Sequence, residues 1–182
     1  MQDSFKIKKS NILYKGKVIS LKVDEISYSN GASGVREIAL HPGGAVVVPL
    51  KDNGKFIMIS QFRYPLQKVI LEFPAGKLDN NEDPLSCAVR ELEEETGYTS
   101  ENFSKLGEIC TAPGFSNEIL HLFIAKNLQQ GKHNREEGEE SMEVFEFTAD
   151  EIEKKITNGE IIDAKTISAF YLAKKILTNN LS

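Results

Sequence analysis

The chain has 182 residues, of which 40% are hydrophobic and 27% charged, a composition typical of a soluble globular domain large enough to bury a core. Its formal net charge of −5 argues against a protein that binds nucleic acid or an anionic membrane through its overall field. No apolar run approaches the ~20 residues of a membrane span. The N-terminus lacks the apolar segment of a signal peptide, so we expect a cytoplasmic protein. The two cysteines predict neither a disulfide framework nor a zinc site, and Cys87 is expected in the core.

The first part of the chain predicts short strands joined by turns. Residues 18–28 alternate in part between apolar and polar side chains, and the sequence SNGASG at 29–34 is typical of a turn between strands. The sequence HPGG at 41–44 then interrupts the pattern. We therefore expect a small antiparallel β-sheet in residues 1–43 and a separate main domain in residues 44–182.

The main domain interleaves strands with a few helices. Such an order predicts an α/β (α+β) fold in which helices cover a mixed sheet as a sandwich. The expected strands are 45–50, 55–64, 69–73, about 104–111, about 119–126 and about 142–148, and the expected helices are 84–96, about 149–158 and about 164–178.

The helix predicted at 84–96 has clear start and stop signals. Asp83 can cap its first turn, Pro84 suits the first helical position, and Gly97 can end it. At 100° per residue the wheel predicts an apolar face made of Leu85, Ala88, Val89 and Leu92.

The same helix gathers glutamates where its dipole is already negative. Glu91, Glu94 and Glu95 share a stripe beside the apolar face, whereas Glu93 points elsewhere. Like charges four residues apart cost about 0.2–0.5 kcal/mol, so a solvated acidic surface is one interpretation. The other is a cation site, because hard carboxylate oxygens beside the turn-rich loop 73–83 suit Mg²⁺ or Mn²⁺.

The stretch from Gly76 to Tyr98 resembles the Nudix box. Every fixed position of that pattern is filled, namely by Gly76, Glu82, Arg90, Glu91, Leu92, Glu94, Glu95, Gly97 and Tyr98. The resemblance implies the Nudix fold, an α/β/α sandwich, and a metal-dependent hydrolase of a nucleoside diphosphate linked to another group. It implies further that the divalent ions are held by Glu91, Glu94, Glu95 and the carbonyl of Ala75, with Arg90 orienting the cluster. For Glu82, both a structural and a metal-binding role remain open.

Residues outside the box are similar to the ADP-ribose pyrophosphatase subgroup. Pro113 lies sixteen residues after Gly97, in the sequence APGFSNE, and Arg63 lies in the sequence QFRYP. This likeness implies Mg²⁺-dependent cleavage of ADP-ribose to AMP and ribose 5-phosphate, with Arg63, Pro113 and Gly114 contacting the substrate. Arg36 is a second candidate, with a plain surface charge as its alternative. Members of this subgroup form homodimers through an N-terminal sheet, which residues 1–43 would supply.

The catalytic base of this subgroup lies on a loop before a late strand, here 134–147. Glu140 is our first candidate and Glu139 the second. The alternative is that this run of charges is only a solvated loop. Tyr28 or Phe5 could stack on the base of the nucleotide. Two alternatives stay open: a Nudix hydrolase of another nucleotide sugar such as GDP-mannose, and a nucleotide-binding module without catalysis.

Overall fold

The computed structural model describes residues 5–132 and 142–179. The chain divides into two compact units, which are described separately here. Unit 1 comprises residues 1–43 together with the segment 110–119, and unit 2 comprises residues 44–109 and 120–182. The segment 110–119, which carries Pro113 and Gly114, thus belongs with the N-terminal strands.

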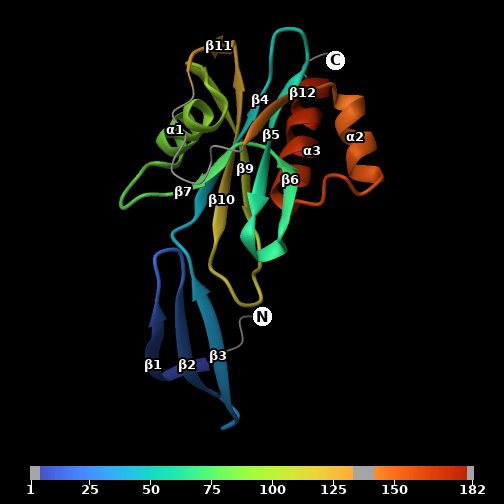
Figure 1. Ribbon diagram of the computed structural model, residues 1–182. Helices are drawn as coiled ribbons and strands as arrows, with labels where there is room; N and C mark the ends of the chain where they lie inside the picture. Colours follow the sequence, from blue (N-terminus) through green and yellow to red (C-terminus); the bar gives the residue numbers. More distant parts are fainter. Residues whose placement is uncertain (1–4, 133–141, 180–182) are drawn as a thin grey trace. The chain divides into compact units, whose positions relative to one another are not determined.

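Unit 1 is built on a three-stranded antiparallel sheet in the order β1-β2-β3 (Figure 1). Its strands are β1 (Phe5–Lys15), β2 (Ser20–Tyr28) and β3 (Ser33–Leu40). The segment 110–119 is tied to β3, since the amide of Ala39 donates to the carbonyl of Phe115 at 2.7 Å and the Ser116 hydroxyl donates to the carbonyl of Ala39 at 3.2 Å. The strands and turns of residues 5–40 leave many large apolar side chains exposed, among them Ile7, Ile12, Leu13, Tyr14, Val18, Leu21 and Val35.

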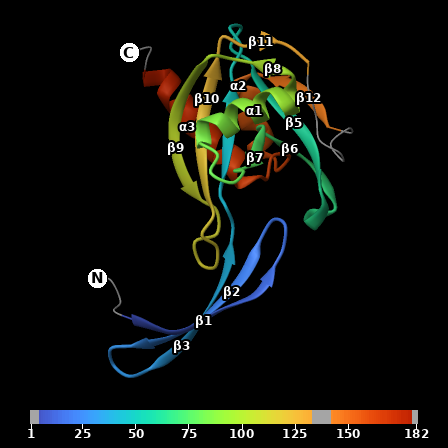
Figure 2. The ribbon, with the colours of Figure 1, turned by 90° about the vertical axis from the view of Figure 1, so that its left-hand side faces the viewer.

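Unit 2 contains a four-stranded sheet in the order β7-β4-β10-β9 and a three-stranded sheet in the order β12-β5-β6. β4 and β10 run parallel, whereas β5 pairs antiparallel with both of its neighbours. Figures 1 and 2 show α1 on one side of these strands and α2 with α3 on the other. The elements are β4 (Gly44–Pro49), β5 (Phe56–Arg63), the 3₁₀ turn η1 (Tyr64–Leu66), β6 (Lys68–Glu72), β7 (Ala75–Lys77), α1 (Pro84–Thr96), β8 (Tyr98–Thr99), β9 (Asn102–Cys110), β10 (Ile119–Lys126), β11 (Gln129–Gln130), β12 (Glu143–Phe147), α2 (Ala149–Thr157) and α3 (Ala164–Asn179).

The strand β4 is buried on both of its faces. Successive side chains of a strand point to opposite faces, and here Val46 and Val48 join the core under α2 and α3 while Ala45 and Val47 join the core under α1. Cys87 is a fully buried member of the second cluster, as expected from the sequence. The predicted α/β sandwich around mixed strands is therefore confirmed, and no helix of the described residues is long and apolar enough to cross a membrane.

The boundaries of α1 agree with the prediction, because the caps lie where the sequence places them. The carboxylate of Asp83 accepts from the amides of Leu85 and Ser86 at 3.0 and 3.2 Å, and Gly97 ends the helix in the left-handed conformation at φ 74°.

The predicted apolar face of α1 is wrong in half of its members. Leu85 and Val89 are 41% and 40% exposed, whereas Ala88 and Leu92 are fully buried. The buried face instead includes Glu91 and Glu95, because α1 turns that side toward β7 and the strand β4 rather than toward solvent.

Candidate active site

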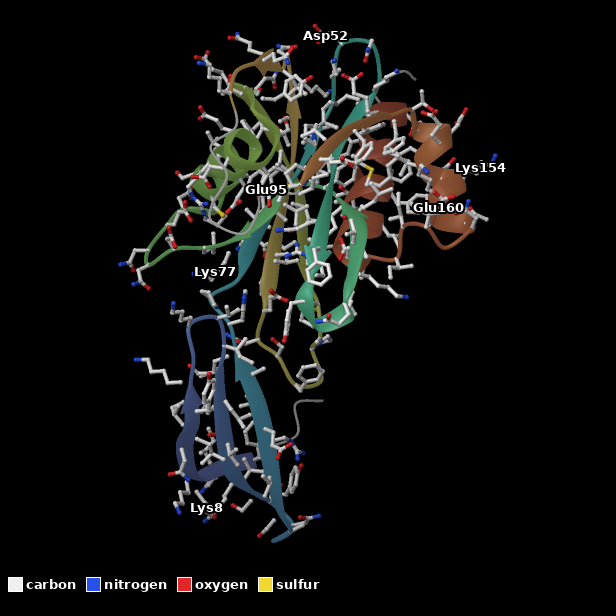
Figure 3. The ribbon with its side chains drawn as sticks, in the orientation of Figure 1. Lys8, Asp52, Lys77, Glu95, Lys154 and Glu160 are labelled. Carbon is white, nitrogen blue, oxygen red and sulfur yellow. The ribbon has the colours of Figure 1, made fainter. Side chains whose placement is uncertain are left out.

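The carboxylates of α1 face the short strand β7. Glu95 is only 2% exposed, and its Oε2 accepts a hydrogen bond from the backbone amide of Ala75 at 2.9 Å. Glu91 is 9% exposed, and its carboxylate lies so close to Gly76 that a Cβ atom there would collide with it. Figure 3 shows Glu95 between α1 and the strands. The first two residues of β7 thus form a backbone surface against which two acidic side chains are held.

Arg90 connects three carboxylates of the same region. Its Nη1 donates to Glu91 at 2.6 Å and to Glu94 at 3.0 Å, and its Nε and Nη2 donate to the two oxygens of Glu82 at 3.0 and 3.1 Å. The hydrogen bond that Arg90 donates to Glu82, together with the nearby charge of Glu91, raises the pKa of Arg90 despite partial burial. The same contact lowers the pKa of Glu82. Both shifts favour the charged forms of Glu82 and Arg90.

Glu82, in the loop before α1, binds both Arg90 and the backbone of that loop. Besides its fork with Arg90, it accepts from the backbone amide of Asp79 at 2.9 Å, which closes the turn before α1. Both oxygens of Glu82 therefore hold the loop and the guanidinium in place. These contacts favour the structural one of the two roles considered for Glu82.

The donor set suits a hard divalent cation. One guanidinium cannot neutralise three carboxylates, and carboxylate oxygens are the ligands that Mg²⁺ and Mn²⁺ prefer. Within residues 5–132 and 142–179, no group of three or more His, Cys, Asp or Glu side chains is already arranged to hold a metal ion. Glu91 and Glu94 converge instead on Arg90, so the chemistry of the residues fits a cation that would share these oxygens with the arginine.

A second charged group lies at the end of β5. Arg63 donates through Nε and Nη2 to the two oxygens of Glu72, on the neighbouring strand β6, at 2.6 and 2.7 Å. This hydrogen-bonded pair raises the pKa of Arg63 against the effect of burial, and the charge of Glu95 contributes to the same shift. The guanidinium of Arg63 is thus anchored on a fully buried carboxylate.

Comparison with known proteins decides the family. The model of the NUDIX domain matches residues 40–170 of this chain. The chain belongs to the NUDIX domain family. It is 44% identical to an ADP-ribose pyrophosphatase of Bacillus subtilis over 90% of this chain and 89% of the relative, and 42% identical to a methanol dehydrogenase activator of Bacillus methanolicus over 88% of each chain.

The fold agrees with that assignment. The crystal structure of an ADP compounds hydrolase superposes with a TM-score of 0.86 at 20% identity, covering 97% of this chain and 95% of the other. The predicted Nudix fold is confirmed, and so is the prediction of a Nudix pyrophosphohydrolase. The cluster on α1 is the Nudix box of this chain.

The remaining substrate candidates lie together in unit 1. Arg36 on β3 stacks over Tyr28, with its guanidinium carbon 5.9 Å from the ring centre, and its Nη2 also donates to the Tyr28 hydroxyl. Both residues line a cavity of about 410 Å³, to which Phe5, Pro113 and Gly114 contribute as well. The structure thus brings Arg36, Pro113 and Gly114 to the lining of one cavity, although Arg36 itself is exposed.

The two candidates for the catalytic base, Glu139 and Glu140, lie outside the described residues. Sequence reasoning missed Glu72, which is fully buried and joins Arg63 to the start of α3. A signal for it exists, since Glu72 is the single charge in the otherwise apolar run VILEF, and an acidic residue inside a buried strand requires a cationic partner.

Proposed function

We propose that this Nudix hydrolase cleaves the pyrophosphate bond of ADP-ribose, yielding AMP and ribose 5-phosphate, with Mg²⁺ as its cofactor. The observation that carries the proposal is the carboxylate cluster of α1, in which Arg90 donates to Glu91 and Glu94 and the amide of Ala75 donates to Glu95, while Arg63 at the end of β5 supplies a guanidinium. The carboxylates suit a divalent cation and the guanidinium suits phosphate oxygens. The B. subtilis relative at 44% identity, an ADP-ribose pyrophosphatase, supports the choice of substrate.

In this proposal Glu91, Glu94 and Glu95 hold the cation, helped by the carbonyl of Ala75. When bound, Mg²⁺ neutralises the anionic pyrophosphate and lowers the pKa of a bound water. Arg90 is proposed to orient Glu91 and Glu94, since a single nitrogen already donates to both. The amide of Ala75 fixes the orientation of Glu95 in the same way.

Arg63 is proposed to bind a phosphate of the substrate. Its Nε and Nη2 donate to Glu72. Among the described residues, none accepts a hydrogen bond from its third nitrogen, Nη1. Because two of its nitrogens are bonded to a buried carboxylate, the Arg63 guanidinium is held rigid. The Nη1 donor therefore points in a fixed direction. A rigid donor loses little entropy when it meets a phosphate oxygen.

Arg36, Pro113 and Gly114 are proposed as further substrate contacts, with Tyr28 or Phe5 stacking on the base. An aromatic ring beside a guanidinium offers the flat, cationic surface that a purine favours. Glu140, with Glu139 as the second choice, is proposed as the general base. A cytoplasmic location stays a prediction from the sequence.

We also propose a homodimer through the sheet of unit 1. The support is the exposure of apolar residues in this unit: Leu13, Tyr14 and Val18 are 64%, 60% and 59% exposed. Large apolar side chains exposed in this number favour an interaction surface over a solvated face. A two-fold axis would pair this surface with its own copy.

The test is a substrate panel. The purified protein is offered ADP-ribose, GDP-mannose, NADH and diadenosine polyphosphates, each with Mg²⁺ and each with chelator, and released AMP is measured. The proposal predicts the highest kcat/KM for ADP-ribose and no turnover with chelator. Preference for GDP-mannose would identify a hydrolase of another nucleotide sugar, and binding without turnover of any substrate would identify a non-catalytic module.

A further inference from the structure

A chain of four charged groups, centred on the buried Glu72, joins β5 and β6 to the start of α3. Glu72, at 0% exposure, accepts from Arg63 on one side and from the ammonium group of Lys165 on the other. Lys165 in turn donates to Asp163 at 2.8 Å. Arg63 and Lys165 therefore share one carboxylate, although they come from elements about a hundred residues apart in sequence.

The start of α3 fixes Lys165 in this position. The carboxylate of Asp163 accepts from the amide of Thr166 at 2.9 Å, which caps the first turn of the helix. The hydroxyl of Thr166 accepts from the amide of Phe73 at 2.9 Å, directly after Glu72 in the chain. The first hydrogen bond fixes the start of the helix and the second ties Thr166, next to Lys165, to the residue that follows β6; the side chain of Lys165 is only 14% exposed.

The shared carboxylate matters for the charge that Arg63 can offer. A bidentate pair of Arg63 with Glu72 alone would be neutral, because one carboxylate cancels one guanidinium, and burial strengthens that attraction. Lys165 supplies a second positive charge to the same carboxylate. Glu72 then holds the guanidinium in place without fully cancelling its charge toward a ligand.

We propose that Lys165 is a positioning residue that acts on the substrate through Glu72 and Arg63, keeping the Arg63 guanidinium both fixed and attractive to a phosphate. This inference rests on the proposed role of Arg63 in binding ADP-ribose. Lys165 itself does not touch the substrate in this account, because its ammonium group is already committed to Glu72 and Asp163.

The test is a double-mutant cycle with Glu72. Lys165→Met removes the charge and keeps most of the stem; it should raise the KM for ADP-ribose about tenfold and change kcat by less than about twofold, since Arg63 binds ground state and transition state alike. In a Glu72→Gln background no carboxylate remains to compete for Arg63, so adding Lys165→Met should change KM by less than about twofold. Lys165→Arg should return KM to within about threefold of the wild type.

Lys174→Met is the matched control. Lys174 lies on the same helix and pairs with Glu153 at 2.6 Å, an ion pair without connection to Glu72. This variant should keep the KM of the wild type. Because the double variant has no carboxylate at position 72, it leaves no unpaired buried charge there, and its folding is a check on whether Lys165→Met alone fails through that charge.

Three outcomes would overturn the inference: an unchanged KM in Lys165→Met, an equal loss in both backgrounds, or a loss confined to kcat. If the wild type binds ADP-ribose without cleaving it, the proposed hydrolysis is wrong. The double-mutant cycle is then measured with the Kd for ADP-ribose, determined by calorimetry, in place of KM. If the wild type neither binds nor cleaves ADP-ribose, both proposals fall together, whereas an additive cycle in an active wild type removes the role of Lys165 alone.

Discussion

Gly76 lies directly against the carboxylate of Glu91, so closely that a β-carbon at position 76 has no room. The contact gives a steric reason for the first fixed residue of the Nudix box. Gly76 is needed here because a side chain would occupy the place of a carboxylate, and its backbone conformation is not the left-handed one. The strand β7 and the helix α1 are thus fitted to each other at the proposed metal site.

Gly76→Ala should therefore displace Glu91 and impair catalysis. A shift of about 1 Å in a positioned group can cost about 10²-fold in rate, so we expect a loss of that order in kcat/KM for ADP-ribose. Mg²⁺ binding measured by calorimetry should weaken in parallel. Thermal unfolding serves as the control for folding, and a folded variant with wild-type turnover and Mg²⁺ affinity would contradict the steric account.

The proposed dimer predicts that a charge on the exposed sheet face of unit 1 yields monomers. Leu21 lies opposite Tyr14 in the antiparallel register, so both side chains share one face of the sheet. Leu21→Glu would bury a carboxylate in the interface, and light scattering should report half the mass of the wild type. Ile176→Glu is the matched control, because Ile176 on α3 is 37% exposed and Leu21 is 36% exposed. A wild type that is itself monomeric at micromolar concentration would contradict the proposed dimer.

Asp163 predicts a specific dependence of stability on pH. Burial alone would raise the pKa of Asp163, but the charge of Lys165 and the hydrogen bonds from Lys165 and Thr166 outweigh it, so the pKa is lowered in the folded protein. A lowered pKa means that the ionised Asp163 stabilises the fold above its unfolded pKa of about 3.9 and that this contribution is lost as the pH falls through the folded value.

Asp163→Asn should accordingly be less stable than the wild type at neutral pH, and the difference in the free energy of unfolding should shrink below about pH 4. Urea unfolding at neutral and acidic pH measures this directly. Asp52→Asn, in the exposed turn after β4, is the control and should leave the difference near zero throughout. A gap for Asp163→Asn that stays constant with pH would show that Asp163 acts only as a helix cap.

The helix α1 was predictable from the sequence because its ends depend on local chemistry. A capping aspartate, a proline and a closing glycine act within a few residues, and Asp83, Pro84 and Gly97 fix both ends. The strand β7 was not predicted, since three residues carry no periodic pattern. It exists because Ala75, Gly76 and Lys77 pair with β4, a tertiary contact.

The site shows the same division between local and tertiary information. The spacing of Glu91, Glu94 and Glu95 indicated the cluster, but a helical wheel assigns burial to apolar residues and so placed Leu85 and Val89 inside. Glu91 and Glu95 are buried because the backbone of β7 approaches them. The spacing of residues along α1 gives no information on that tertiary contact. Likewise, the run VILEF shows that Glu72 needs a partner but does not identify Lys165.

A comparison of Glu95→Gln with Glu93→Gln separates a carboxylate of the proposed metal site from an exposed one on the same helix. Both lie on α1, but Glu95 is buried against β7 whereas Glu93 is exposed. Both variants are assayed for ADP-ribose hydrolysis and for Mg²⁺ binding by calorimetry, with thermal unfolding as the control for folding. If the α1 carboxylates hold the catalytic cation, Glu95→Gln folds but loses turnover by about 10²-fold or more and binds Mg²⁺ more weakly, while Glu93→Gln matches the wild type. A folded Glu95→Gln variant with near-wild-type hydrolysis and Mg²⁺ affinity would contradict the account.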